Sequence, residues 1–163
     1  MMLAIPESDV NCPVSWRARP GSFVSLMSLY ESNYIRLAAL VPPAVMWPLA
    51  PVSEAAVSHV PGDCPLHLRI EDRSRYTTTL TLTYLFEDDA GTLCDPDLRI
   101  RVYHDARLAE AHACARWHRH AVLAALRSEL ARALGERWLR NMMLNKWLDY
   151  CAERGHRFAA ALG

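Results

Sequence analysis

Apolar residues recur with different spacings along the chain and divide it into a helical start, an extended middle and a helical end. Ser22 can cap a helix, and apolar positions such as Leu26 and Leu29 then recur at roughly helical intervals until Pro42-Pro43. A residue before proline is biased away from the helical conformation, so the prolines end this pattern. The sequence therefore predicts a first helix, followed by a proline-rich loop over residues 42–53.

Between about Ala55 and Cys114 the apolar period changes from helical to two. Alternation of this kind is typical of half-buried strands, and it predicts strands over 66–71, 76–86 and 98–105. Residues 107–114 alternate as well but are rich in alanine, so strand and helix both stay open there. Short connections between neighbouring strands favour an antiparallel meander, of about five strands in all.

After Trp117 the period returns to helical, and Gly135 either separates two helices or sits within one bent helix. Gly155 is placed to close the last helix in a left-handed conformation. The order predicts an α+β fold, with an N-terminal helix, the meander, and two C-terminal helices packed on one sheet face. Prolines without apolar periodicity mark 1–20 as an irregular extension, which leaves 21–163 as a single domain.

The overall charge is balanced, because 18 basic residues match 18 acidic ones. There is no global electrostatic footprint for nucleic acid or for an anionic membrane, so neither is favoured as a partner. No stretch approaches the ~18 apolar residues of a membrane helix, and the N-terminus lacks the features of a secretory signal. The five cysteines are scattered and form no C-x-x-C pair, which fits a reducing compartment. We expect a cytoplasmic protein.

Several short stretches together resemble a known family: Leu29-Tyr30-Glu31-Ser32-Asn33-Tyr34, Ser74-Arg75-Tyr76-Thr77-Thr78, Val102-Tyr103-His104-Asp105-Ala106 with Ala109-Glu110, and Asn141, Trp147-Leu148 and Gly155-His156. With these the chain resembles the YqiB-like proteins, which are found mainly in proteobacteria and have no established function. The resemblance implies a compact cytoplasmic domain. Genes of that family often lie beside those of nucleotide-processing enzymes, which hints at nucleotide-linked physiology by association only.

Strand parity places polar side chains together on one face of the predicted sheet, namely His67, Arg69, Glu71, Thr77, Thr79, Thr81, Thr83, Arg99, Arg101, Tyr103 and Asp105. One interpretation is a solvated sheet face with cross-strand ion pairs. The other is a docking face for an anionic ligand, because arginine and threonine suit phosphate groups. The candidate ligand-binding residues are Arg75, Tyr76, Thr77, Arg99, Arg101, Tyr103, Asp105 and Arg107.

Parity turns His104 toward the apolar side, while Asp105 points with the arginines. A neutral histidine there would be a candidate general base, oriented by a carboxylate such as Glu31 or Glu110. The alternative is a buried histidine that holds the strand end to a helix. Nucleophile motifs of the G-x-S-x-G type and phosphate-binding glycine loops are absent from the sequence.

Four metal-ligating residue types lie close together at the end of the extended region, at His112, Cys114, His118 and His120. Their types suit zinc, but their spacing matches no structural zinc module. We therefore predict neither a metal nor a cofactor.

The last helix carries a wide apolar stripe that includes Trp138, Met142, Met143 and Trp147. Such a stripe is expected in the core, and any surplus would serve a homodimer seam. The leading functional hypothesis is a small accessory or regulatory protein that binds an anionic small molecule or a protein partner. The alternative is a hydrolase or transferase that acts on a nucleotide-like substrate through His104.

Overall fold

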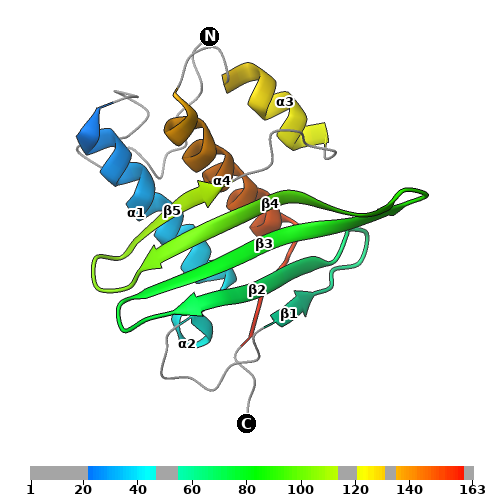
Figure 1. The fold of residues 1–163 in the computed structure, drawn as a ribbon, viewed down its shortest axis with the longest axis horizontal. Helices are drawn as coiled ribbons and strands as arrows, with labels where there is room; N and C mark the ends of the chain where they lie inside the picture. Colours follow the sequence, from blue (N-terminus) through cyan, green and yellow to red (C-terminus); the bar gives the residue numbers. More distant parts are fainter. Residues whose placement is uncertain (1–21, 47–54, 114–120, 131–134, 160–163) are drawn as a thin grey trace.

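The computed structural model describes residues 22–46, 55–113, 121–130 and 135–159. Its elements are α1 (Phe23–Leu40), α2 (Pro43–Met46), β1 (Ala55–Ser58), β2 (Leu66–Arg73), β3 (Thr77–Asp88), β4 (Gly91–Tyr103), β5 (Leu108–Ala113), α3 (Ala121–Leu130) and α4 (Glu136–Glu153). Figure 1 shows the sheet in front of α1 and α4. The chain therefore has the predicted α+β fold. The predicted extension over 1–20 lies outside the described residues.

The five strands are all antiparallel neighbours in the order β1-β2-β3-β4-β5, which confirms the meander. Residues 108–113 form a strand, so the choice left open by the alanine-rich sequence is settled. Strand β4 begins at Gly91, well before the predicted start at Leu98. The register shifts opposite Leu82 and Tyr84, and Asp97 has a φ of 52°. A bulge of this kind breaks the period of two, which explains why the sequence pattern ends there.

The start of α1 and the two ends of α4 lie at residues whose types signal helix ends in the sequence. The Ser22 side chain accepts a hydrogen bond from the Ser25 backbone N–H and caps α1. Gly135 is the N-cap residue of α4, so it separates two helices, and Gly155 follows α4 with a φ of +91°. The prediction of a loop over residues 42–53 is wrong in part, because residues 43–46 form the short helix α2. Proline is favoured at a first helical position, where its missing N–H costs nothing.

Helices α1 and α4 run parallel to each other on one face of the sheet (Figure 1). Their apolar side chains and those of β2, β3, β4 and β5 form the main core, in which Leu37, Leu80, Ile100 and Trp147 are almost fully buried. A second, smaller cluster joins the first turns of α1 to Trp138 and Met142 of α4. The predicted stripe on α4 is buried throughout, which confirms it as core. Helix α3 lies against α4. In the described part of the chain, no helix is long and apolar enough to cross a membrane.

Three fully buried asparagines join α1 to α4 and to the edge strand β5. The Asn145 amide donates to Asn33 Oδ1 at 3.0 Å, and Asn33 donates in turn to Asn141. Asn141 Oδ1 accepts the backbone N–H of Ala111 at 2.8 Å. Because an edge strand exposes unpaired backbone groups, a side chain that binds one of them occupies a position that a further strand would need.

Candidate functional site

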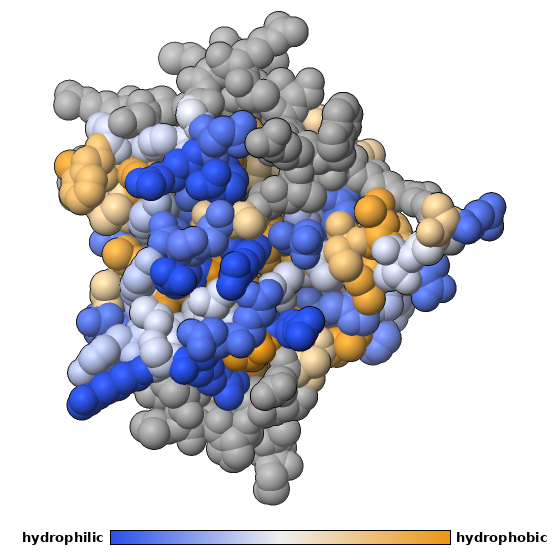
Figure 2. All heavy atoms as spheres, viewed as in Figure 1, coloured by the Kyte–Doolittle hydropathy of each residue, from blue (hydrophilic) through white to orange (hydrophobic). Residues whose placement is uncertain are grey.

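The sheet face opposite the helices is polar, and it is the face toward the viewer in Figure 2. Parity correctly placed Arg69, Glu71 and Arg99 on this exposed surface. It was wrong about the exposure of Thr79 and Thr83, which are buried. Strand β3 is central, and its short threonines lie between longer side chains of the neighbouring strands. The solvated surface is therefore made by arginine and glutamate more than by threonine hydroxyls.

Much of the charge on this face is paired. Arg99 Nε lies 2.7 Å from Glu71 Oε2, and the Thr81 hydroxyl donates to Glu71 Oε1 at 2.8 Å. Arg101 hydrogen-bonds Tyr103. Within the described part of the chain, Arg69 forms no ion pair, although it shares a cross-strand row with Thr81 and Arg99. Arg69 thus has charge to spare for a ligand on this face.

A hollow of about 360 Å³ opens on the same face across β1, β2, β3 and β4. We call it the sheet hollow; its polar walls include His67, Arg69, Glu71, Thr81, Thr83 and Asp97, and its apolar walls include Val57 and Leu85. This volume falls within the range of small-molecule sites. None of the predicted ligand-binding residues lines the hollow. Arg99 is connected to it only by its ion pair with Glu71, which does line the hollow.

Most of the other predicted ligand-binding residues meet at one end of the sheet, where the β2–β3 and β4–β5 turns lie side by side (Figure 1). The His104 backbone N–H donates to the Tyr76 carbonyl oxygen at 2.9 Å and ties the two turns together. The Arg75 guanidinium lies 5.2 Å from the centre of the Tyr76 ring. The residues that gather here are Arg75, Tyr76, Thr77, Tyr103, Asp105 and Arg107, whereas Arg99 and Arg101 lie further along β4.

A larger groove of about 620 Å³ lies beside the β4–β5 turn, and we call it the hairpin groove. Helix α1 contributes Phe23, Leu26, Met27 and Tyr30, the turn region contributes Tyr103, Asp105, Ala106, Leu108 and Glu110, and α4 contributes Arg137. The α1 residues follow i, i+3, i+4, i+7 spacing, so one helix face forms a wall. Three candidates from the sequence, Tyr103, Asp105 and Glu110, therefore share one cavity.

Glu110 is the central acceptor of this groove. The Tyr103 hydroxyl donates to Glu110 Oε1 at 2.6 Å, and His112 Nε2 lies 3.1 Å from the same oxygen. Burial and the nearby Glu110 raise the pKa of Tyr30 to about 12, and burial and the hydrogen bond to Glu110 also raise the pKa of Tyr103. Both phenols therefore stay protonated at neutral pH and act as hydrogen-bond donors.

The candidate base His104 is buried, as parity predicted, but it lines neither cavity. The Thr78 hydroxyl donates to the Met46 carbonyl oxygen at 2.8 Å, so it accepts from His104 Nε2 at 2.7 Å. Burial lowers the pKa of His104 and keeps its ring neutral. Glu31 is exposed on α1, and Glu110 binds Tyr103. The arrangement anchors the end of β4 to the segment after α1.

The candidate metal ligands fall mostly outside the described residues, which hold His112 but not Cys114, His118 or His120. His112 is half-exposed and pairs with Glu110. Among the residues that the structure describes, no three His, Cys, Asp or Glu side chains are grouped to hold a metal ion.

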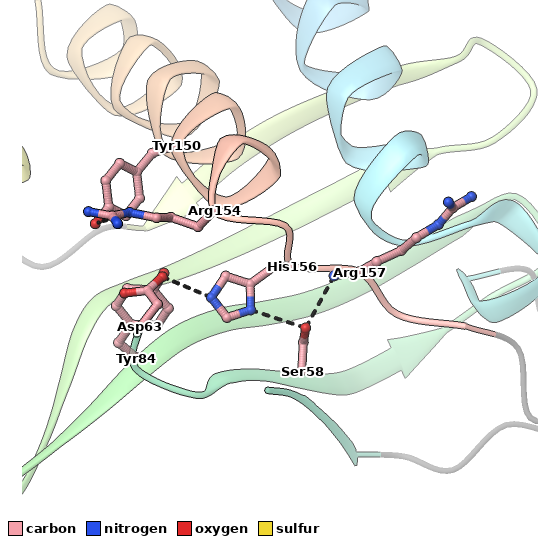
Figure 3. Close-up of polar contacts among 7 residues, drawn as sticks. All are labelled: Ser58, Asp63, Tyr84, Tyr150, Arg154, His156 and Arg157. Carbon is pink, nitrogen blue, oxygen red and sulfur yellow. Dashed lines mark hydrogen bonds and ion pairs between the residues drawn. The ribbon is translucent and has the colours of Figure 1, made fainter. Parts of the chain in front are cut away.

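A second polar cluster, which sequence reasoning missed, joins β1, the β1–β2 turn, β3 and the segment after α4 (Figure 3). His156 Nδ1 lies 3.1 Å from Ser58 Oγ, and His156 Nε2 lies 3.0 Å from Asp63 Oδ2. The Tyr84 hydroxyl donates to the same Asp63 oxygen at 2.6 Å, and the Arg157 backbone N–H donates to Ser58 Oγ at 3.1 Å. We call these contacts the C-terminal clasp.

The clasp has the residue types of a serine hydrolase triad, but its surroundings argue for a structural role. Ser58 and His156 are buried, and neither lines the sheet hollow or the hairpin groove. A nucleophile needs a site where substrate can approach it. Burial would raise the pKa of Asp63, but hydrogen bonds from Tyr84 and His156 outweigh this and lower it. Asp63 is therefore a partly buried carboxylate that fastens the chain after α4 to the sheet.

Comparison with known proteins shows that the chain belongs to a family of proteins of unknown function, DUF1249, whose family model matches residues 36–157. The match extends from the second half of α1 to the clasp, so it includes the whole sheet and α4. No curated protein and no solved structure matches the chain.

Proposed function

We propose that this protein is a non-catalytic binding module that holds a small anionic molecule in the sheet hollow. The observation that carries the proposal is the guanidinium of Arg69, which forms no ion pair with any described residue and borders a hollow of ligand size on the helix-free sheet face. Guanidinium groups bind phosphate and carboxylate in a bidentate manner, and His67 beside Arg69 adds a second nitrogen donor.

The walls of the hollow favour a ligand with two different ends. Arg69 and His67 come from β2, whereas Asp97 comes from the bulge of β4. A phosphate or carboxylate group suits the β2 side, and hydroxyl or amino groups of the same molecule suit Asp97. A sugar phosphate or nucleotide carries both kinds of group. The resemblance to YqiB-like proteobacterial proteins supports a cytoplasmic accessory role, which agrees with such metabolites.

The position of His104 speaks against the enzymatic alternative. Its Nε2–H is committed to Thr78, and its ring lines neither cavity. A general base must lie within hydrogen-bond reach of the proton that it removes from a bound substrate. We therefore prefer binding to catalysis.

The test uses ribose 5-phosphate and AMP as probes, with ribose and adenosine as their uncharged controls, followed by amide chemical shifts. We expect the phosphate probes to shift the amides around Arg69 and Asp97, and Arg69→Gln to weaken their binding at least ~tenfold, which is the size expected of one charge-assisted contact. Arg75→Gln is the matched control, because Arg75 is an exposed arginine at the far turn.

Equal losses in Arg69→Gln and Arg75→Gln would contradict the proposal. So would shifts caused equally by ribose and by ribose 5-phosphate. If the amides of the hollow instead responded only to protein concentration, with a rise in molar mass by light scattering, the face would be a homodimer surface and the small-molecule proposal would be wrong.

A further inference from the structure

The hairpin groove differs from the sheet hollow in how its carboxylates are balanced: Glu71 of the hollow is paired with Arg99, whereas neither carboxylate of the groove pairs with an arginine or lysine among the described residues. Two carboxylates line it, Asp105 and Glu110, against the single cation Arg137. Its net charge is therefore negative, which disfavours the phosphate groups suited to the sheet hollow. Two binding sites of opposite preference on one domain would not compete for the same ligand.

The position of Glu110 within the groove is fixed by its neighbours. Tyr103 and His112 meet one of its oxygens, and Tyr30 from α1 also hydrogen-bonds the carboxylate. Three donors leave capacity for another, because a carboxylate offers about four acceptor positions. The side chain of Glu110 is only 20% exposed, so a cation that reached it would be partly shielded from water. An ion pair of that kind is stronger than one at an open surface.

The remaining walls suit an apolar body next to that cation. Leu26, Met27 and Leu108 provide aliphatic surface, and the Phe23 side chain at the groove is 75% exposed. Contact with an apolar ligand would remove this large apolar side chain from water, which is favourable in free energy. The two phenol rings around Glu110 also favour a cation, since aromatic faces attract positive charge.

We propose that the hairpin groove binds a small organic amine, whose ammonium group pairs with Glu110 between Tyr30 and Tyr103 and whose apolar body lies along Leu26 and Met27 of α1. The lining gives each part of this ligand a complementary surface, and Asp105 at the rim adds attraction for the approaching cation. A phosphate ester or a fatty acid would meet the same carboxylates with the wrong sign.

The test compares three probes with the same six-carbon body, hexylammonium, hexan-1-ol and hexanoate, by titration and amide chemical shifts of the full chain. Hexylammonium is expected to shift the amides of α1 and of residues 103–110 and to bind at least tenfold more tightly than hexan-1-ol. Hexanoate is expected to cause no shifts. Ethylammonium, which lacks most of the apolar body, is expected to bind at least tenfold more weakly than hexylammonium.

The decisive variant is Glu110→Gln, because its amide oxygen can still accept from Tyr103 while the charge is lost. It should weaken hexylammonium at least tenfold, whereas the control Glu71→Gln, which removes a carboxylate from the sheet face, should leave the affinity unchanged. Asp105→Asn on the exposed turn provides a second variant, with an expected loss of about threefold. Binding of hexanoate as tight as that of hexylammonium, or unchanged affinity in both Glu110→Gln and Asp105→Asn, would overturn the proposal.

Discussion

Replacing Tyr84 with phenylalanine tests whether the C-terminal clasp stabilises the fold. Tyr84 is fully buried, its ring packs edge-on against Trp147 with centroids 4.7 Å apart, and its hydroxyl donates to Asp63 at 2.6 Å. Tyr84→Phe keeps the ring contact and removes the hydroxyl, with its hydrogen bonds to Asp63 and Cys151. The variant therefore isolates the polar part of the clasp.

The structure sets the size of the expected effect. A hydrogen bond to a charged group contributes about 1.5–3 kcal/mol, so we expect Tyr84→Phe to lower the free energy of unfolding by about 2 kcal/mol. For a domain of this size, that corresponds to a fall in Tm of about 4–8 °C. If Asp63 is first changed to asparagine, the hydroxyl meets a neutral acceptor and should contribute only about 1 kcal/mol.

The pH dependence of the stability difference between wild type and Tyr84→Phe gives a further check. Asp63 has a pKa below its ordinary value of 3.8 in the folded protein, so its contribution is complete above that pH and is lost as the pH falls through the folded value. The difference between wild type and Tyr84→Phe should thus be constant from about pH 5 to pH 8 and shrink below about pH 4.

Urea unfolding followed by circular dichroism measures these differences, with Tyr76→Phe as control, since Tyr76 is 50% exposed at the β2–β3 turn. A Tyr84→Phe variant within ~0.5 kcal/mol of wild type would refute the reasoning, because surface changes without effect fall in that range. An equal cost with and without the Asp63 carboxylate would refute the role of its charge.

Three further substitutions test other parts of the fold. Asn141→Ala removes the acceptor of the Ala111 N–H and should cost about 1–3 kcal/mol, with faster hydrogen exchange at that amide. Because burial lowers the pKa of His104, the unfolded chain takes up a proton near pH 6.5 before the folded chain does, so the free energy of unfolding should fall below that pH. Unfolding measured from pH 7.5 to 5.5 should show a smaller fall in this free energy for His104→Gln than for wild type. Gly155→Ala should cost about 1–2 kcal/mol in urea unfolding, since only the backbone φ of +91° opposes it and its new methyl would meet Val60 at an ordinary 3.9 Å.

The overall architecture could be predicted because its signals are local. A period of two marks the strands, and the Ser22 cap and Gly155 mark the beginning of α1 and the end of α4. The early part of β4 could not be found in this way, because the bulge at Asp97 reverses the parity of the residues before it. The burial of Thr79 also escaped prediction, since it depends on the side chains of neighbouring strands.

The candidate site was less accessible to prediction, because its contacts join distant parts of the chain. Tyr103, Asp105 and Glu110 lie close together in the sequence, and they do line one groove. Tyr30 and Arg137 complete that groove from two helices, and no periodicity reports such a meeting. The clasp is similar, since His156 lies 93 residues from Asp63. Pairs at such separations require the fold to be known first.

The asparagine bridge from α4 to Ala111 has a consequence for how copies of this protein could associate. At the opposite side of the sheet, β1 is the outer strand in the described structure, and it is four residues long. Two molecules joined through β1 would form one continuous ten-stranded sheet, in which the bridge occupies one backbone N–H of each outer β5 strand. The bridge therefore disfavours strand addition at the middle of β5, so β1 is the more accessible outer strand for a second copy.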